Sequence, residues 1–207
     1  MKSRFRFLII FAPALLAVGV FTAAVALRVV SPVPSVTTSG TAAIGGPFTL
    51  VTTSGEDVSD QTYRGKWLLI FFGYTFCPDA CPTALNNISV ALEKLGLDAA
   101  KLQPLFVTVD PHRDTRGHMR DYLESFDSRI IGLTGTQDQI DRVLKEYRVY
   151  VVQERSEADD NDYLVSHSAY IYLMNPNGKF VNVVQGDETG ENIAVWLRKE
   201  ISSNSSS

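Results

Sequence analysis

Both cysteines of the 207-residue chain, Cys77 and Cys81, lie in one short stretch, "FFGYTFCPDACPTAL" at residues 71–85. Thiolates are nucleophiles and soft metal ligands, so a closely spaced pair can form a disulfide, act as a redox couple or bind a metal ion. Pro82 suits the first turn of a helix, where its missing N–H costs nothing. Pro78 keeps Cys77 out of that helix, so the two sulfurs can approach each other. The spacing alone leaves all three roles open.

The position of this pair in the predicted fold favours reactive sulfurs. The apolar run at residues 67–72, closed by Gly73, predicts a central strand buried on both faces. A predicted helix at residues 83–96 follows the cysteines, and sites in open α/β sheets form at the carboxyl ends of such strands. The unpaired amides and the dipole at a helix start stabilise thiolate over thiol. We therefore expect lowered pKa values for both sulfurs.

Two thiolates rarely complete a metal site, so the three histidines, His112, His118 and His167, are the next candidates. In a thioredoxin-like fold the start of the hairpin strand faces the cysteine loop and usually carries a cis proline; here Ser166 and His167 take that place. We expect His167 to approach the cysteines, although its position alone leaves a ligand role and no role equally open. For His112, in a loop, and His118, near the exposed start of a predicted helix, we expect no role.

Two thiolates and one imidazole form a soft, three-coordinate set, which suits Cu(I). Zinc would need a fourth ligand or a water, and a [2Fe–2S] cluster would need four ligands. An added oxygen ligand would accommodate Cu(II), and Asp79 and Asp110 are the candidate carboxylates in the sequence.

Hydrophobic patterning predicts one α/β domain, a central mixed sheet with helices on both faces. Right-handed crossovers make the first strands parallel, and the "NPNG" turn at residues 175–178 predicts a hairpin that adds an antiparallel edge. Thr136 and Gln139 form a capping box at one helix start, and Gly96 is expected to end another helix. Residues 154–163 are acidic without an apolar period, which predicts a solvated loop. The expected strands lie at residues 67–72, 102–110, 130–135, 168–174 and 179–184, after an N-terminal hairpin at 47–59, and the expected helices at 83–96, 115–126, 136–148 and 189–201.

The N-terminal part of the chain differs from the rest. Basic residues precede an uncharged apolar stretch at residues 7–27. About 20 such residues span the hydrocarbon core as a helix, and the basic flank keeps the N-terminus in the cytoplasm. We predict a transmembrane anchor rather than a cleaved signal peptide, whose apolar core is usually about 7–15 residues long. The predicted organisation is a cytoplasmic tail at 1–6, the anchor at 7–28, a flexible linker at 29–46, a folded domain at 47–202 and a disordered tail at 203–207.

Charge and export limit the possible partners. The part that follows the anchor has 15 basic and 23 acidic residues, a net charge of −8, and such a domain repels phosphate backbones, which argues against a nucleic-acid partner. Outside the cytoplasm a thiol pair is oxidised unless a reductant or a bound metal protects it.

Five blocks of this sequence together resemble the Sco (SenC/PrrC) proteins, in the order of that family: "GYTFCPDACPTAL", "VDPHRDT", "IIGLTGT", "EYRVY" and "HSAYIYLMNPNGKF". The likeness runs from about residue 48 to residue 201. It implies an α/β, thioredoxin-like fold after an N-terminal transmembrane helix, with a copper-binding domain at residues 47–202. It also implies that Cys77, Cys81 and His167 bind a copper ion, as Cu(I) and also as Cu(II).

The resemblance implies a membrane-anchored metallochaperone rather than an enzyme, which delivers copper to the binuclear copper centre of cytochrome c oxidase subunit II. The alternative is a thiol–disulfide reductase that keeps the copper-site cysteines of that subunit reduced. Cys77 and Cys81 would then be the catalytic pair, joined as a disulfide when oxidised. Further expected partners are an upstream copper donor and a thiol reductant. The expected location is the bacterial inner membrane, with a single span and the main domain in the periplasm or outside the cell membrane.

The family's D-P-x-R-D block corresponds here to Asp110, Pro111, Arg113 and Asp114. We expect this block to shape the site, with an internal ion pair between Arg113 and Asp114. The position between Pro111 and Arg113 is commonly acidic in the family, whereas this chain has His112, which we do not expect to be a ligand.

Overall fold

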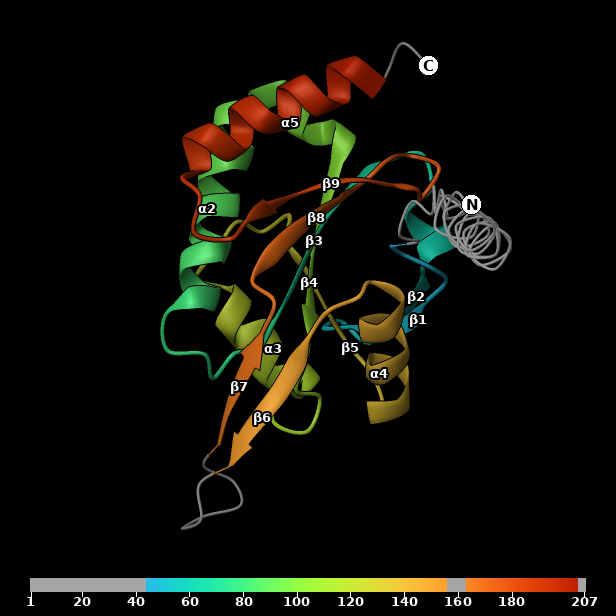
Figure 1. Cartoon of the computed structure of the whole chain (residues 1–207), viewed down its shortest axis with the longest axis vertical. Helices are drawn as coiled ribbons and strands as arrows, with labels where there is room; N and C mark the ends of the chain where they lie inside the picture. Colours follow the sequence, from blue (N-terminus) through green and yellow to red (C-terminus); the bar gives the residue numbers. More distant parts are fainter. Residues whose placement is uncertain (1–43, 156–162, 205–207) are drawn as a thin grey trace, which may run out of the picture. The chain divides into compact units, whose positions relative to one another are not determined.

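The computed structural model describes residues 44–155 and 163–204. Its centre is a seven-stranded mixed sheet with the strand order β2-β1-β5-β4-β3-β8-β9 (Figure 1). The strands of this sheet are β1 (Thr49–Thr52), β2 (Asp57–Ser59), β3 (Trp67–Gly73), β4 (Leu102–Thr108), β5 (Ile131–Thr134), β8 (Tyr170–Met174) and β9 (Phe180–Gln185).

The strand directions follow the sequence prediction. β3, β4 and β5 are parallel neighbours, whereas β8 pairs with β3 in the antiparallel direction and forms a hairpin with β9. Every residue of β3 is buried, as expected for a central strand covered on both faces. The predicted N-terminal hairpin is also present, as β1 and β2. The sheet and its helices thus have the predicted α/β, thioredoxin-like arrangement.

Helices cover both faces of the sheet. In Figure 1, α2 lies to the left of the sheet, α5 crosses the top of the view in contact with α2, and α4 lies to the right. Thr136 and Gln139 form the predicted capping box at the start of α4, and Gly96, with a positive φ of 58°, follows the last residue of α2. The C-terminal helix extends two residues into the stretch predicted as a disordered tail. The helices are α2 (Ala80–Leu95), α3 (Arg116–Leu123), α4 (Gln137–Glu146) and α5 (Gly190–Asn204), with short 3₁₀ turns η1 (Asp60–Tyr63) and η2 (Gly96–Lys101).

Successive residues of β3 point to opposite faces of the sheet, which divides the core into two layers. Phe71 stacks on Phe106 of β4, with ring centroids 6.2 Å apart, on the face covered by α2 and α3. Phe72 packs instead against Tyr147 and Tyr172, at 5.3 and 5.6 Å, on the face covered by α4. The strand that precedes the cysteines is therefore fixed from both sides.

A second, two-stranded antiparallel sheet corrects the two ends of the solvated loop predicted at residues 154–163, because residues 154, 155 and 163 belong to strands. It consists of β6 (Val151–Arg155) and β7 (Tyr163–His167), with Val151 opposite His167. In β7, Tyr163 and Val165 are buried while the residues between them are exposed. The acidic run concealed this short alternation, and only residues 156–162 between the strands lie outside the described part of the chain.

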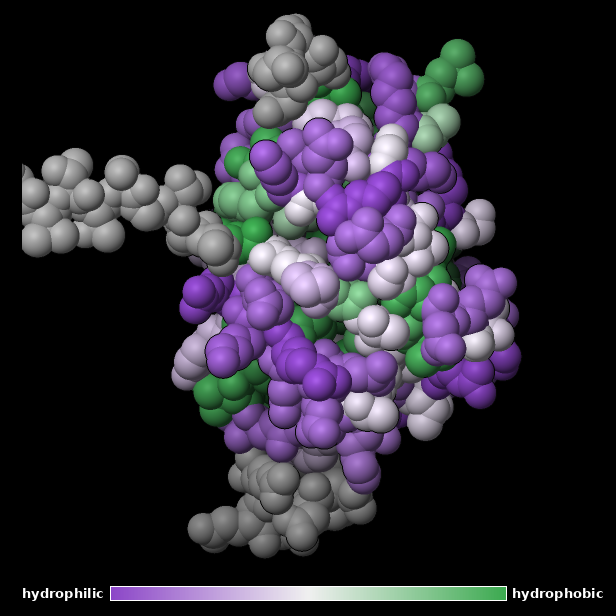
Figure 2. All heavy atoms as spheres, turned by 90° about the vertical axis from the view of Figure 1, so that its right-hand side faces the viewer, coloured by the Kyte–Doolittle hydropathy of each residue, from purple (hydrophilic) through white to green (hydrophobic). Residues whose placement is uncertain are grey.

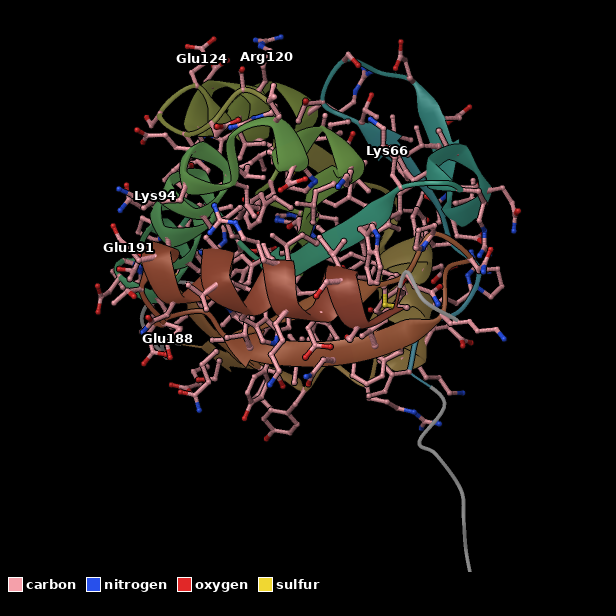
Figure 3. All side chains as sticks on the ribbon, turned by 90° about the horizontal axis from the view of Figure 1, so that it is seen from above. Lys66, Lys94, Arg120, Glu124, Glu188 and Glu191 are labelled. Carbon is pink, nitrogen blue, oxygen red and sulfur yellow. The ribbon has the colours of Figure 1, made fainter. Side chains whose placement is uncertain are left out.

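Most charged groups lie on the surface, whereas Asp110 and Asp114 are buried. Hydrophilic residues cover most of the side that carries α4, where hydrophobic residues show mainly in a few openings (Figure 2). Lys94, in the last turn of α2, lies near Glu191, in the first turn of α5, with Nζ 3.8 Å from Oε1 (Figure 3). Such an exposed pair contributes little to stability.

None of the helices within the described residues is long and apolar enough to cross a lipid bilayer. The predicted anchor at residues 7–28 lies outside the described residues, as do most of the predicted linker and the end of the predicted tail.

Candidate metal centre

The start of α2 places the two cysteines as the sequence predicts. Cys81 lies in the first turn of the helix and Cys77 in the preceding loop. The side chain of Asp79, the residue before the helix, makes no capping hydrogen bond. The backbone N–H of Cys81 instead donates to Cys77 Sγ at an N–S distance of 3.4 Å. A sulfur therefore accepts from an amide that a helix start leaves without a partner, which draws Cys77 towards Cys81.

The last residue of β7 brings an imidazole to this pair. His167 Nε2 lies 3.4 Å from Cys81 Sγ, although the two residues are 86 positions apart in sequence. His167 Nδ1 lies 3.2 Å from the carbonyl oxygen of Ser168. One ring nitrogen of His167 therefore lies against the sulfur of Cys81, and the other lies against a backbone carbonyl oxygen.

The two sulfurs differ in their proton affinity. The hydrogen bond from the Cys81 side chain, supported by bonds from His167 and two backbone amides, outweighs burial and lowers the pKa of Cys77 to about 3. The same bond to Cys77, together with burial, raises the pKa of Cys81. The prediction of two lowered pKa values is therefore wrong for Cys81, because its sulfur is fully buried and shares its proton with the neighbouring thiolate.

The donor set fits copper in kind, but it is not yet in ligand geometry. Within residues 44–155 and 163–204, no group of three or more His, Cys, Asp or Glu side chains is arranged to hold a metal ion. Bonds of about 2.0–2.3 Å to a shared ion would separate a sulfur from a nitrogen by roughly 3.6 Å or more. The contact of 3.4 Å between Cys81 and His167 is thus a hydrogen bond, which must lose its proton and open slightly before an ion can replace it.

The other histidines lie elsewhere. The ring of His118 stacks on Phe76, with centroids 4.9 Å apart, and no contact joins it to either sulfur in the described structure. His112 is exposed and lines a different hollow. Asp110, a candidate oxygen ligand, is only 1% exposed and binds Arg113 and Tyr163 instead.

The structure of the D-P-x-R-D block contradicts one prediction, the ion pair between Arg113 and Asp114. Arg113 pairs with Asp110, with Nε 2.5 Å from Oδ2, and not with Asp114. Asp114 accepts hydrogen bonds from the side chains of Thr75 and Thr108, at 2.5 and 2.7 Å. Desolvation raises the pKa of Asp114 against these bonds. The two carboxylates therefore have different partners, which their closeness in the sequence could not reveal.

Sequence reasoning missed two tyrosines beside the site. Tyr74 packs edge-on against the His167 ring at 6.0 Å and accepts a hydrogen bond from the backbone N–H of Val165. Tyr163 donates its hydroxyl to Asp110 at 2.8 Å. For Tyr163, the sequence signal was the alternation of buried and exposed residues in β7. For Tyr74, the signal was its position directly after the apolar run of β3.

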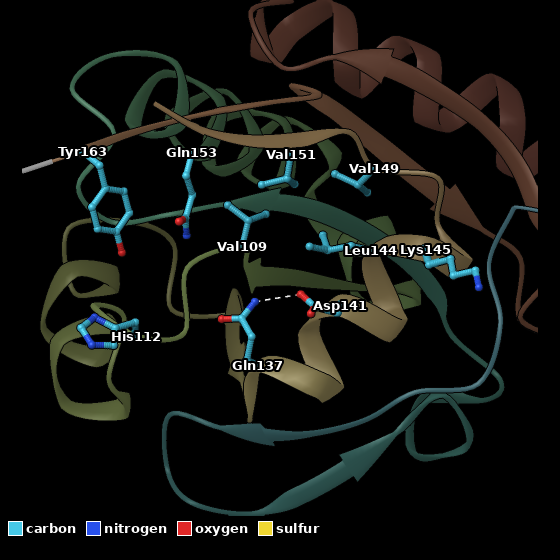
Figure 4. Close-up of a pocket in the computed structure, with 10 residues that line it drawn as sticks. All are labelled: Val109, His112, Gln137, Asp141, Leu144, Lys145, Val149, Val151, Gln153 and Tyr163. Atoms are coloured by element: carbon cyan, nitrogen blue, oxygen red, sulfur yellow. Dashed lines mark hydrogen bonds between the residues drawn. The ribbon is translucent and has the colours of Figure 1, made fainter. Parts of the chain in front are cut away.

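A hollow within the described residues lies away from the two sulfurs. It has a volume of about 830 Å³ and lies between α4 and the β6–β7 hairpin, with an apolar floor that includes Val109 and Leu144 and a polar rim that includes His112 and Asp141 (Figure 4). A hollow of about 530 Å³ lies beside the cysteines, between the start of α2 and residues 168–170. Solvent and a partner can therefore reach the cysteine loop from the side of α2.

Comparison with known proteins points to one family. The SCO1/SenC family model matches residues 36–202. Protein SCO1 homolog 2, mitochondrial, of Arabidopsis thaliana is 43% identical over 161 residues, which are 77% of this chain and 58% of that protein. The chain spans about half the length of several such relatives.

The similar solved structures include several with copper bound. ScoI of Bradyrhizobium japonicum, solved with copper bound, is 45% identical, with a TM-score of 0.71 over 76% of this chain and 99% of its own. ScoI of Arabidopsis thaliana, also solved with copper bound, is 37% identical, with a TM-score of 0.72 over 78% of this chain and 99% of its own.

Proposed function

The chain belongs to the SCO1/SenC family, and from this premise we propose that it binds one copper ion through Cys77, Cys81 and His167. We further propose that it is anchored in the bacterial inner membrane by residues 7–28 and delivers the ion to the binuclear copper centre of cytochrome c oxidase subunit II. An upstream copper donor and a thiol reductant would complete its set of partners.

The observation that carries this proposal is the contact between Cys81 Sγ and His167 Nε2. The fold brings the imidazole ring of His167 against the sulfur of Cys81. The pKa of the neighbouring Cys77 is lowered to about 3, so this second sulfur is a thiolate at neutral pH. Two sulfurs and one nitrogen are soft donors, which favour Cu(I) over harder ions. Relatives that are 45% and 37% identical have been solved with copper bound, which supports the choice of metal.

Ligand exchange would release the ion. Cys77 is half-buried whereas Cys81 is fully buried, so an incoming thiolate reaches the ion from the side of Cys77. In a three-coordinate site the new ligand can bind before an old one leaves. His167 is the neutral ligand and is held outside the main sheet, so we expect it to leave first and the cysteines to follow.

A titration of the reduced chain with Cu(I) tests the ligand set. We expect a stoichiometry near one, lost in Cys77→Ser and Cys81→Ser. We expect an affinity at least about 10–100-fold lower in His167→Ala, because loss of a ligand costs no less than loss of a group that orients one. His118→Ala is the matched control, because that ring stacks on Phe76 away from the sulfurs. An unchanged affinity in His167→Ala would contradict the proposal.

The asymmetry of the cysteines favours a second candidate, a thiol–disulfide reductase. The Cys77 thiolate would attack a disulfide of the oxidase subunit and form a mixed disulfide. Cys81, after losing its proton, would displace the partner's sulfur, so that the partner gains two thiols and the chain is left with a Cys77–Cys81 disulfide. Full oxidase assembly in cells carrying His167→Ala, with none in either cysteine variant, would favour this function.

A further inference from the structure

Three side chains interlock at the first residue of β7. Arg113 donates from Nε to Asp110 Oδ2 at 2.5 Å and from Nη1 to the carbonyl oxygen of Tyr163 at 3.0 Å. Its guanidinium lies over the Tyr163 ring, 3.6 Å from the centroid. Tyr163 closes the ring of contacts by donating its hydroxyl to Asp110 Oδ1 at 2.8 Å. The Arg113 and Asp110 side chains are 13% and 1% exposed, so these charge-assisted bonds lie largely out of water.

A fourth side chain holds β7 two residues further along. Tyr74, only 2% exposed, accepts a hydrogen bond from the Val165 N–H at 3.2 Å. The Arg113 guanidinium lies 5.7 Å from the Tyr74 ring, and the His167 ring packs against the same ring at 6.0 Å. We call Tyr74, Asp110, Arg113 and Tyr163 the β7 clamp.

The clamp acts on a strand that lies outside the main sheet. Within the described residues β7 pairs with β6 alone, in a separate two-stranded sheet, and a two-stranded hairpin is marginally stable on its own. Residues 163, 165 and 167 lie on one face of β7 because side chains alternate, and the clamp fixes the first two. The cysteines need no such device, since β3 and α2 position them from the main sheet.

We propose that the β7 clamp is the device that places His167 against the cysteine pair, with Arg113 and Tyr163 as positioning residues for this ligand. The inference rests on the proposed function for the role of His167 as a copper ligand. Within the described residues Arg113 Nη2 has no hydrogen-bond partner. The guanidinium is therefore fixed by the fork of hydrogen bonds from Nε and Nη1 and by its stack over the Tyr163 ring. A lysine can supply the charge but neither the fork nor the stack.

Two variants of the full chain test this proposal. Arg113→Lys keeps the charge, and Tyr163→Phe keeps the ring but removes the hydroxyl bond to Asp110. Tyr63→Phe is the matched control, because the Tyr63 hydroxyl is buried without a partner in the described structure. We expect Cu(I) affinity to fall about tenfold or more in both clamp variants, as for groups that orient a metal ligand, and to stay unchanged in Tyr63→Phe.

Two further measurements separate positioning from general support. Pulsed EPR of the Cu(II) form should show one coordinated imidazole in the parent chain, and a weakened or heterogeneous nitrogen coupling in the clamp variants. In the metal-free chain, ¹⁵N-histidine NMR should show the His167 ring signals shifted or broadened in these variants, while those of His118 stay in place. Tyr163→Phe retains the buried ring, so it keeps the test valid if Arg113→Lys does not fold.

The outcomes distinguish the two proposals. If the parent chain and His167→Ala bind copper equally, His167 is not a ligand, and both the proposed function and the clamp's purpose are overturned. If His167→Ala weakens copper binding while folded Tyr163→Phe matches the parent in affinity, nitrogen coupling and His167 ring signals, the proposed function stands and the clamp proposal is overturned.

Discussion

The two ends of β7 are built in opposite ways. At the first residue, Tyr163 is held by its ring, its hydroxyl and its carbonyl oxygen. At the last residue, the His167 side chain has a contact of 3.4 Å to a sulfur, a hydrogen bond to the next carbonyl oxygen and two edge-on ring contacts. The strand is therefore anchored where it does no chemistry and lightly held where it meets the cysteines.

This contrast suits a site that must release what it binds. A ligand held by many bonds would make a tight site but would exchange slowly, whereas an unsupported ligand would seldom meet the sulfurs. Fixing the strand at residue 163 supplies the direction of the ring, and the weak contacts at residue 167 leave it free to depart. The predictions below test whether the two ends differ in this way.

The largest expected effect is a loss of folding stability at the anchored end of β7. Asp110→Asn removes the charge that Arg113 faces in a largely buried site, and breaking such a pair typically costs about 3–5 kcal/mol of stability. His167→Ala should cost much less, because its polar contacts are few. Urea denaturation measures both, with Asp121→Asn as the control, since Asp121 pairs with Arg120 at the surface. Equal losses for Asp110→Asn and His167→Ala would show that the ends do not differ.

A smaller loss of stability is expected from a substitution that crowds the sulfur of Cys81. A Cβ added at Gly73 would lie 2.9 Å from both Cys81 Sγ and Phe106 Cε2, and overpacking of this kind typically costs about 1–3 kcal/mol. Gly73→Ala should also weaken copper binding, because the sulfur must move relative to His167. Gly117→Ala is the control, as a Cβ there meets nothing within 4 Å; in a helix it should stabilise by roughly 0.5–1 kcal/mol. Wild-type copper affinity in Gly73→Ala would show that the sulfur's position is less critical than the contact suggests.

Local signals in the sequence predicted most of the fold. The uninterrupted apolar run of β3, the capping box at Thr136 and the turn at residues 175–178 each act within a few residues, and the structure agrees with all three. The cysteine loop was predictable for the same reason, since Pro78 and Pro82 fix the backbone on either side of the helix start.

The remainder depended on contacts between distant segments. The partner of Arg113 is decided by how the loop after β4 turns beneath β7, so two nearby aspartates looked equivalent in sequence. The raised pKa of Cys81 depends on complete burial and on a neighbouring thiolate, which outweigh the helix start. β7 itself was concealed because the acidic residues before it are typical of a loop, while its hydrogen bonds reach distant residues, Tyr74 and Asp110.

The smallest expected effect concerns the reactivity of Cys77, which should depend very little on pH. Its pKa is lowered to about 3, so the thiolate is complete above about pH 5 and is lost only as the pH falls through the lowered pKa. Alkylation of the reduced, metal-free chain by iodoacetamide should therefore change less than about twofold between pH 6 and 9. A thiol with the ordinary pKa of about 8.5 would accelerate by more than about a hundredfold over this range.

The source of the lowered pKa can be tested in the same assay. Cys81→Ala removes the side chain whose hydrogen bond is the largest cause of the lowering, so part of the pH dependence should return. His167→Ala should restore less, because its bond to Cys77 is a smaller cause than that of Cys81. If the rate in the parent chain rose tenfold per pH unit, Cys77 would be an ordinary thiol. The sulfur beside the lightly held end of β7 would then not be poised to bind an ion, and the contrast between the two ends would have no consequence for exchange.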